Sequence, residues 1–437
     1  MIRRLLSATR QSARGVWDDI KASTDASLLG VMRFVGLLYG PIDRRLQIDQ
    51  AFRKALQYRL PSYVGWRHAP GGVTYLLFMV LVVTGVLLAV FYRPSVEEAY
   101  PSIQHIVSER PFGWLIRDVH HWAANLIVIA LLAHMARVFF EAAYKPPRET
   151  NWLLGILLLG VVLAFGSTGY LLPWDQWSYW IVTEVMNAVG HWPVVGTTLA
   201  DRLMGDVIVS GATLSRFFAL HVIVLPWVAF VLLGYHFTLV RRRGIAPPMT
   251  QPEERPRWRK SGLFSPEDES NDGIPFFPNH LLRSFIVGTL TLTVTVTLAI
   301  LWPRTVAPPA DPYSLPDRLV STWVPVDVSL ALIRLVGPWG LGAFFVLGVS
   351  LILIPLVDRG PERQLRKRPV VAAVGLSFFL GYVVLFAAGR IIGSVPPSAD
   401  LRQPEAAELT VPTRPGVPLP EPGLPEIPDD GSGGGAR

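Results

Sequence analysis

The chain contains no cysteine. This absence excludes disulfide bonds, iron–sulfur clusters ligated by this chain, thiolate-bound zinc and the covalent attachment of a c-type haem. Charge is also scarce, because only 17% of the 437 residues are charged whereas 51% are hydrophobic. A water-soluble protein of this length carries more charge, so the composition indicates a protein that resides in a lipid bilayer. The net charge of +7 then indicates basic cytoplasmic loops rather than nucleic-acid binding.

Apolar segments recur along the chain, and a helix that crosses a bilayer needs roughly 20 such residues. Seven segments qualify or nearly so: residues 73–92, 118–139, 152–171, 217–240, 284–303, 338–357 and 370–389. If the N-terminus is cytoplasmic, the inner loops hold 27 Lys and Arg residues and the outer loops hold 12. The sequence therefore predicts an all-α polytopic protein of a bacterial inner membrane, with its C-terminal tail outside.

Composition divides the chain into five regions. Residues 1–60 form a basic, partly amphipathic cytoplasmic segment that lacks the apolar core of a signal peptide. Residues 61–243 contain four of the apolar segments and residues 283–392 contain three. Residues 244–282 between them form a charged, Pro-containing cytoplasmic linker, and residues 393–437 form a Pro- and Gly-rich tail that we expect to be disordered.

Two of the apolar segments carry histidines near both of their ends. His120 and His134 are 14 residues apart in the second segment, and His221 and His236 are 15 apart in the fourth. A 14-residue step returns to within roughly 40° of the same helix face and rises about 21 Å. One buried histidine is most simply a packing residue, but ionisable groups inside a membrane are functional candidates. Four at matched depths predict two bis-imidazole haem sites, one above the other.

Glycines repeat the same step on the other two helices of the first domain. Gly71 and Gly85 are 14 residues apart, as are Gly155 and Gly169. A flat macrocycle against a helix needs positions without side chains, although glycine also serves helix packing in membranes. Three arginines near the helix ends are candidates for pairing with haem propionates, with interface snorkelling as the alternative: Arg117, Arg137 and Arg216. His121 lies on a different face from His134, and we interpret it as a neighbour of a haem edge.

The stretches WLIRDVHHWAANLIVIALLAHMARV, GSTGYLLPWDQWSYW and LSRFFALHVIVLPWVAFVLLGYHF resemble cytochrome b of the bc-type complexes. Three later stretches, IPFFPNHLLRSFIVGTL, PPADPYSLPDRLVSTW and RKRPVVAAVGL, are similar to subunit IV of the cytochrome b6f complex. The resemblance covers about residues 39–392. It implies a four-helix di-haem domain of the cytochrome b or b6 type, fused to a three-helix domain of the subunit IV type.

The resemblance implies particular ligands and partners. His120 with His221 would hold the outer of two b-type haems, and His134 with His236 the inner one. Quinol would be oxidised outside and quinone reduced inside, which contributes to the proton-motive force. The expected partners are a Rieske-type iron–sulfur protein, a c-type cytochrome or other redox subunit, membrane lipid and a second copy of the chain.

The same resemblance gives candidate quinone sites. Arg241 follows His236 by five residues, where the family has an arginine at the inner quinone pocket; a positive inner flank is its other explanation. Asp175, within the Pro-Trp-Asp-Gln segment, and Trp323 would lie at the outer pocket as catalytic candidates.

Two departures from the family pattern affect what the chain can do. The family carries Pro-Glu-Trp-Tyr, whose glutamate accepts a proton from quinol, whereas this chain reads Ser321-Thr322-Trp323-Val324. A hydroxyl cannot act as a base near neutral pH. Asp317 and Asp327 are nearby carboxylates, but neither occupies the motif position. Ala69 stands where the plastid form has a cysteine that binds an extra haem, so no covalent haem is expected.

Two alternatives therefore stay open beside the quinol-oxidising subunit. The chain could be a haem-bearing module of an atypical complex or dehydrogenase that exchanges electrons with quinone at the inner site only. The missing glutamate favours this reading. The chain could also be a secondary transporter with histidines in a proton relay, which b-type absorbance would exclude.

Overall fold

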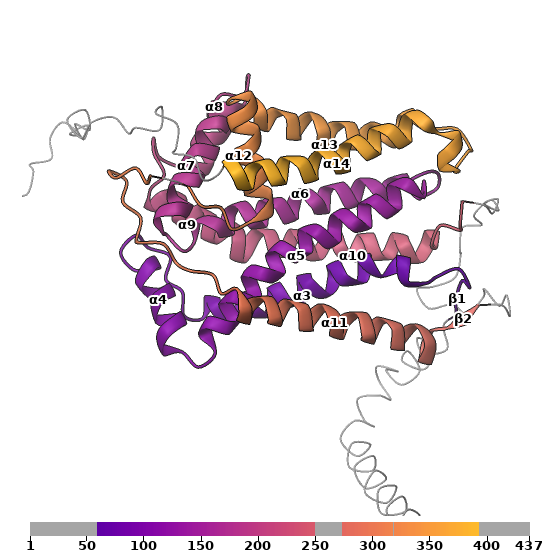
Figure 1. The fold of residues 1–437 in the computed structure, drawn as a ribbon, viewed down its shortest axis with the longest axis horizontal. Helices are drawn as coiled ribbons and strands as arrows, with labels where there is room; N and C mark the ends of the chain where they lie inside the picture. Colours follow the sequence, from indigo (N-terminus) through magenta and orange to yellow (C-terminus); the bar gives the residue numbers. More distant parts are fainter. Residues whose placement is uncertain (1–58, 250–272, 318, 393–437) are drawn as a thin grey trace, which may run out of the picture.

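Long apolar helices form the body of the protein and run roughly along its long axis (Figure 1). The computed structural model describes residues 59–249, 273–317 and 319–392. The expected amphipathic segment before residue 59, the middle of the linker and the tail after residue 392 lie outside the described residues. Within the described ranges the fold is all-α, as the apolar segments predict, apart from one two-residue strand pair.

The elements follow one another in the order of the apolar segments. The first domain holds β1 (Arg59–Leu60), η1 (Trp66–His68), α3 (Ala69–Ala89), α4 (Ala99–Glu109), α5 (Gly113–Phe140), α6 (Glu149–Leu171), α7 (Gln176–Gly190), α8 (Gly196–Met204), α9 (Gly211–Ala219), η2 (Leu220–Val224) and α10 (Leu225–Arg243). The second holds β2 (Ile274–Pro275), η3 (Phe276–His280), α11 (Leu281–Leu301), α12 (Val324–Val336), α13 (Gly340–Val357), η4 (Leu365–Lys367) and α14 (Pro369–Ile392). Strand β1 pairs with β2 in antiparallel fashion and so joins the two domains.

Six helical stretches among the described residues are long and apolar enough to cross a membrane. They are Trp66–Ala89, Gly113–Phe140, Glu149–Leu171, Gly211–Arg243, Pro278–Leu301 and Pro369–Ile391. A shorter apolar stretch in α13, Gly348–Val357, corresponds to the remaining predicted segment. The chain is therefore an integral membrane protein with about seven spans, as expected.

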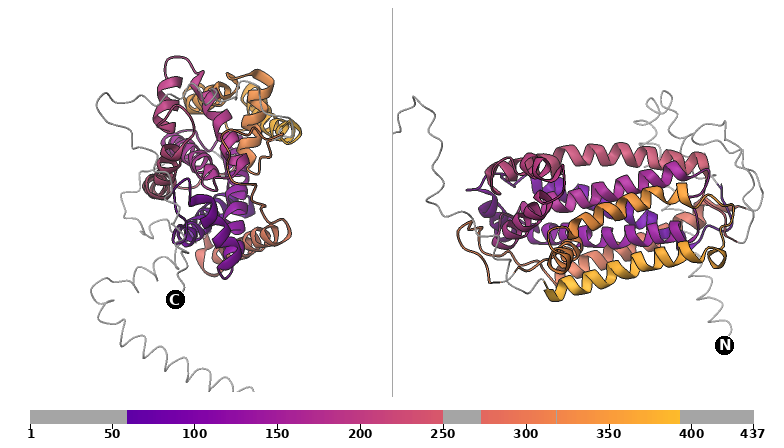
Figure 2. Two further views of the ribbon diagram at one scale, coloured as in Figure 1. Left: turned by 90° about the vertical axis from the view of Figure 1, so that its left-hand side faces the viewer. Right: turned by 90° about the horizontal axis from the view of Figure 1, so that it is seen from above.

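The first domain is built around two helix pairs. Helix α3 packs along α5, and α10 packs along α6. The second domain surrounds this bundle, because α11 packs on α5 and α3 while α13 contacts α6 and α14 contacts α5. Figure 2 shows these long helices side by side. The short helices α4, α7, α8, α9 and α12 gather at one end of the bundle, on the left in Figure 1, which we call the capped end.

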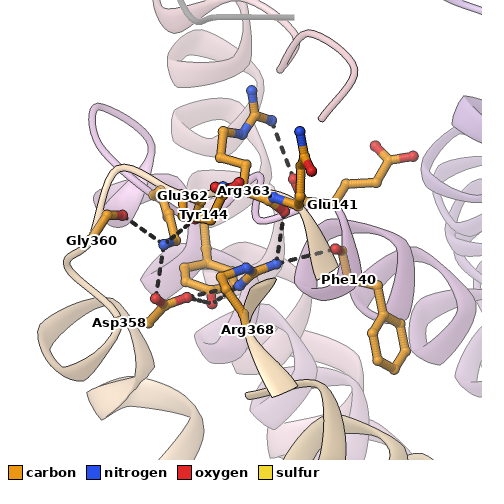
Figure 3. A network of polar contacts seen from close by, with 10 residues as sticks. Phe140, Glu141, Tyr144, Asp358, Gly360, Glu362, Arg363 and Arg368 are labelled. Atoms are coloured by element: carbon orange, nitrogen blue, oxygen red, sulfur yellow. Dashed lines mark hydrogen bonds and ion pairs between the residues drawn. The ribbon is translucent and has the colours of Figure 1, made fainter. Parts of the chain in front are cut away.

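A buried polar network joins the two domains at the opposite end (Figure 3), which we call the network end. Lys145 Nζ donates to Asp358 Oδ1 at 2.8 Å and to the carbonyls of Gly360 and Glu362, each at 2.7 Å. Arg368 donates to Asp358 Oδ2 at 2.8 Å, and Tyr144 also donates to this carboxylate. Every cation here meets an acceptor from the other helix pair, so the network fixes the α5–α6 turn to the α13–α14 turn.

Candidate functional site: two buried histidine pairs

The capped-end pair consists of His120 on α5 and His221 in η2. Their ring centroids are 6.4 Å apart. His221 Nδ1 lies 2.9 Å from the Phe165 carbonyl, which can only accept, so Nδ1 carries the proton. His120 Nδ1 lies 2.8 Å from Thr84 Oγ1, whose own proton is directed to the Val80 carbonyl at 2.6 Å. Both Nδ1 atoms are therefore donors, and both Nε2 atoms keep a free lone pair for a metal.

The network-end pair consists of His134 on α5 and His236 on α10. Both line one cavity of about 290 Å³ between α3, α5, α6 and α10. Its wall is mostly apolar, with Phe78 and Phe165 among its residues and Arg137 near one edge. Among the described residues, His134 Nδ1 is buried without a hydrogen-bond partner. A buried polar atom facing a cavity of this shape indicates a bound group with both flat apolar and polar parts.

A π-helical turn at the capped end explains the unequal histidine spacing. The sequence predicts one continuous fourth helix, but the structure divides it into α9, the π turn η2 and α10. His221 lies within η2, and Pro226 follows near the start of α10. Proline supplies no backbone N–H, and a π turn accommodates one extra residue. The 15-residue step from His221 to His236 is thereby brought back close to the phase of the 14-residue step on α5.

Three of the four predicted glycines lie directly against ligand-candidate histidines. A Cβ at Gly71 would lie 3.1 Å from His134, one at Gly85 3.3 Å from His120, and one at Gly169 2.5 Å from His221. Their absent side chains thus make room for imidazole rings. A Cβ at Gly155 would meet nothing within 4 Å, and this residue lines the network-end cavity. Here the space belongs to the cavity, as expected for a position beside a macrocycle.

The predicted arginines have different surroundings. Arg137 lines the network-end cavity and pairs with Glu141 at 2.9 Å. Arg117 is buried and donates to the Arg304 carbonyl at 2.9 Å, while Arg216 donates to the Arg202 carbonyl at 2.6 Å. Arg241 is exposed at the end of α10 and is not part of the cavity lining. Of the four, only Arg137 faces a histidine cavity.

The two predicted outer-site residues are both buried at the capped end. Asp175 caps α7 by accepting from the Ser178 N–H at 2.8 Å, and it pairs with Arg304 at 3.6 Å. Trp323 donates from Nε1 to the Ala124 carbonyl of α5 at 3.1 Å. A Cβ at Gly166 would lie only 1.8 Å from the Trp323 ring, so the indole is wedged against α6. Asp175 thus has a structural partner for each oxygen, whereas Trp323 joins the second domain to α5 and α6.

Several site residues escaped the sequence analysis. Thr84 and Thr168 each precede a predicted glycine, and both lie near a capped-end histidine Nδ1. The repeated Thr-Gly dipeptide is a signal that could have found them. Arg148 and His68 line the network-end cavity, and nothing in their local sequence distinguishes them from loop residues.

Fold and site together define a polytopic all-α membrane protein with two buried histidine pairs. A family model described as Cytochrome b/b6/petB matches residues 55–244. Cytochrome b6 of Acaryochloris marina (strain MBIC 11017) is 39% identical over 212 residues, which are 48% of this chain and 99% of that protein. Cytochrome b6 of Synechococcus sp. (strain JA-3-3Ab) is 38% identical over the same shares.

A solved structure extends the similarity to the second domain. A chain of a structure titled "Hyperthermophilic respiratory Complex III" has a TM-score of 0.69 and 27% identity, and the match covers 83% of this chain and 93% of that one. The cytochrome b6 relatives match about half of this chain, so the additional coverage includes much of the second domain. This chain belongs to the cytochrome b/b6 family.

Membership in a cytochrome family implies haem, and the histidine geometry fits it. Imidazole nitrogens bind transition metals at about 2 Å, so two imidazoles on opposite sides of one metal have ring centres roughly 6 Å apart. The observed 6.4 Å between the His120 and His221 rings agrees with this. The unpartnered His134 Nδ1, the open space at Gly155 and the cavity wall fit a second group.

Proposed function

We propose that this chain is the di-haem cytochrome b subunit of a quinol-oxidising complex of the Complex III type. The single observation that carries the proposal is the capped-end pair, with its 6.4 Å ring separation and both Nδ1 protons directed away from the shared space. Bound at the two pairs, haem would supply one-electron carriers at both ends of the membrane-spanning bundle. Electron transfer is favoured over a transporter with a proton relay, because neutral imidazoles with fixed tautomers suit ligation.

The chain's own residues hold and orient these groups. Thr84 and the Phe165 carbonyl fix the capped-end imidazoles by accepting their Nδ1 protons. At the network end, Arg137 and Arg148 line the cavity and are suited to pair with haem carboxylates. The apolar wall excludes water, which stabilises neutral imidazole and restricts proton access to the metal.

We assign the inner quinone to a second cavity at the network end. It has a volume of about 300 Å³, lies between α3 and α11, and is lined by His68, His280 and Arg283 among other residues. His68 also lines the histidine cavity, so the two spaces share a wall. The His68 Nε2 atom is buried without a hydrogen-bond partner among the described residues. This cavity offers quinone oxygens several donors, whereas Arg241, the candidate from the sequence, remains a secondary one.

We assign quinol oxidation to the capped end, near Trp323, with the second domain forming the site's cover. By resemblance, a Rieske-type iron–sulfur protein would dock there, together with a c-type cytochrome or another acceptor, and two copies of the chain would associate. The expected orientation places the capped end outside and the network end in the cytoplasm of a bacterium.

A second candidate function is a haem module that uses only the inner quinone. The observation that favours it is Thr322, which occupies the position of the family glutamate and whose carbonyl accepts from Asn125 at 3.2 Å. The two candidates differ in one measurable respect, which is quinol oxidation at the capped end.

The test uses the full chain purified in its native complex. Reduced-minus-oxidised spectra and a redox titration should give two b-type components, and His221→Leu and His236→Leu should each remove a different one. A chain without b-type absorbance contradicts the proposal. Quinol oxidation blocked by outer-site inhibitors, with a Rieske-type protein co-purifying, supports the two-site complex; inhibitor-insensitive reduction alone supports the haem module.

A further inference from the structure

The segment 321–324 lies along α5 without a carboxylate at its motif position. Asn125 connects the two, because its Oδ1 accepts from the Val324 N–H at 3.0 Å and its Nδ2 donates to the Thr322 carbonyl at 3.2 Å. Together with the Trp323 bond to α5, these contacts fix the segment's position. Thr322 offers only a hydroxyl there, so any carboxylate that serves this site comes from elsewhere in the chain.

Asp327 lies one helical turn beyond the segment, in the first turn of α12. Its N–H donates to the Trp323 carbonyl at 3.3 Å, and its side chain is only 2% exposed. Helix α14 approaches very closely here, because a Cβ at Gly389 would lie 1.9 Å from the Asp327 carbonyl oxygen. This contact brings the next residue of α14, Arg390, to the Asp327 carboxylate. Asp317, the other nearby carboxylate, is exposed in the loop.

The ion pair between these residues is incomplete. Arg390 Nε lies 3.4 Å from Asp327 Oδ2, which has no hydrogen bond among the described residues. The guanidinium is engaged elsewhere, since its Nη1 donates to the Ser321 carbonyl at 3.0 Å. Burial raises the pKa of Asp327 to about 6, against the opposing effects of Arg390 and Ser321. A buried carboxylate with a free oxygen atom and a pKa near working pH is suited to proton transfer.

Arg390 links this buried carboxylate to water. Its side chain is 52% exposed, whereas that of Asp327 is 2% exposed. The other titratable group of α14 that faces Asp327 is Tyr382, whose buried hydroxyl has no partner among the described residues. Another pair, Glu184 with Arg334, is closer at 3.0 Å and accepts a hydrogen bond at 3.1 Å. That pair therefore looks structural, and the Asp327 pair does not.

We propose that Asp327 is the proton acceptor of the outer quinol site and releases the proton to water beside Arg390. The inference rests on the proposed function, since it requires quinol to be oxidised at the capped end. In the proton step, a quinol O–H bond breaks and its electron pair stays on the quinol oxygen, which becomes the quinolate. The new O–H bond forms on the Asp327 carboxylate. The proton then passes to water at the exposed edge of Arg390.

The test compares Asp327→Asn and Asp327→Glu with the matched control Glu184→Gln, all in the full complex. Positioned acid–base groups contribute about 10²–10⁴ in rate. We expect Asp327→Asn to lower the kcat of quinol oxidation at least 100-fold with KM changed less than about twofold, Asp327→Glu to retain part of the rate, and Glu184→Gln to stay near wild type. The infrared carboxyl band of a buried acid titrating near pH 6 should vanish in Asp327→Asn.

A second variant keeps the inference testable if Asp327→Asn fails to assemble. Removing the Arg390 charge in Arg390→Gln should move the acidic limb of the kcat–pH profile, and the infrared titration with it, to higher pH. A limb that stays in place, or an Asp327→Asn complex with near wild-type kcat, overturns the inference while leaving the proposed function intact. A wild-type complex that binds haem but does not oxidise quinol overturns both.

Discussion

The two histidine pairs lie on the same helices but in different surroundings. At the capped end, His120 and His221 are oriented by hydrogen bonds to Thr84 and the Phe165 carbonyl. At the network end, His134 and His236 face a cavity of about 290 Å³, and the polar groups around them are arginines. One pair is thus fixed by neutral acceptors of the bundle itself, and the other by the cavity wall. The comparison teaches that equal spacing in sequence does not give equal sites.

The strongest way to break this comparison is to fill the network-end cavity alone. Gly155→Leu adds a side chain where the chain itself leaves open space, so it clashes only with a bound group. We expect reduced-minus-oxidised spectra to lose the network-end b-type component and keep the other. Gly160→Leu is the control, because Gly160 lies on the same helix, also has open space, and is exposed. Two unchanged components in Gly155→Leu would show that no haem lies against this position.

A smaller effect should follow from loosening the network end. Asp358→Asn breaks the pairs with Lys145 and Arg368, whose side chains are each 5% exposed. We expect a loss of about 3 kcal/mol, the low end for a buried pair, measured as a lower thermal unfolding midpoint. Lys367→Met, in an exposed pair with Glu362, should lose less than about 1 kcal/mol. Equal losses in the two variants would mean that the network does not hold the domains together.

The pH dependence of stability should follow the same carboxylate. Burial by itself raises the pKa of Asp358, but hydrogen bonds from Lys145, Tyr144 and Arg368 outweigh it and hold the pKa below its ordinary value. The stabilisation is therefore complete above the ordinary pKa of 3.8 and is lost as the pH falls through the lower folded-state pKa. Asp358→Asn should flatten this acid decline of the unfolding midpoint.

The smallest expected effect concerns the orientation of one capped-end ring. Thr84→Val keeps the shape but removes the acceptor of the His120 Nδ1 proton. Loss of such a partner typically weakens metal binding 10–100-fold, so the capped-end haem should dissociate more readily on dilution and its potential should shift. Thr291→Val is the control, because that hydroxyl bonds only a carbonyl of its own helix turn, Val287, at 2.8 Å. An unchanged potential in Thr84→Val would mean that the tautomer of His120 is set by another group.

Much of the fold could be predicted from the sequence, because apolar length alone determines whether a helix can span a membrane. The candidate site was partly predictable for the same reason: histidine and glycine spacings on regular helices give depth and face directly. The prediction failed in detail where regularity failed. The fourth helix contains a π turn at His221, and a helix of uniform pitch gives the wrong phase for His236.

Contacts between distant segments were beyond the sequence. Arg117 and Arg216 looked like propionate partners by position, yet the structure directs them to the carbonyls of Arg304 and Arg202. Asp327 gained its significance only from Gly389, whose missing side chain lets α14 bring Arg390 beside it. Such pairings depend on helix packing across more than 60 residues of chain, which local pattern does not encode.

The sequence by itself determined the solvent, the helices and the four histidines, since each depends on composition or on short periodic spacing. Only the tertiary structure decided which atoms these histidines bond and which carboxylates are satisfied. The physical reason is that a buried polar group is stabilised or left free by partners that meet it through folding. Asp358 meets two cations and a tyrosine, whereas Asp327 meets one arginine at 3.4 Å.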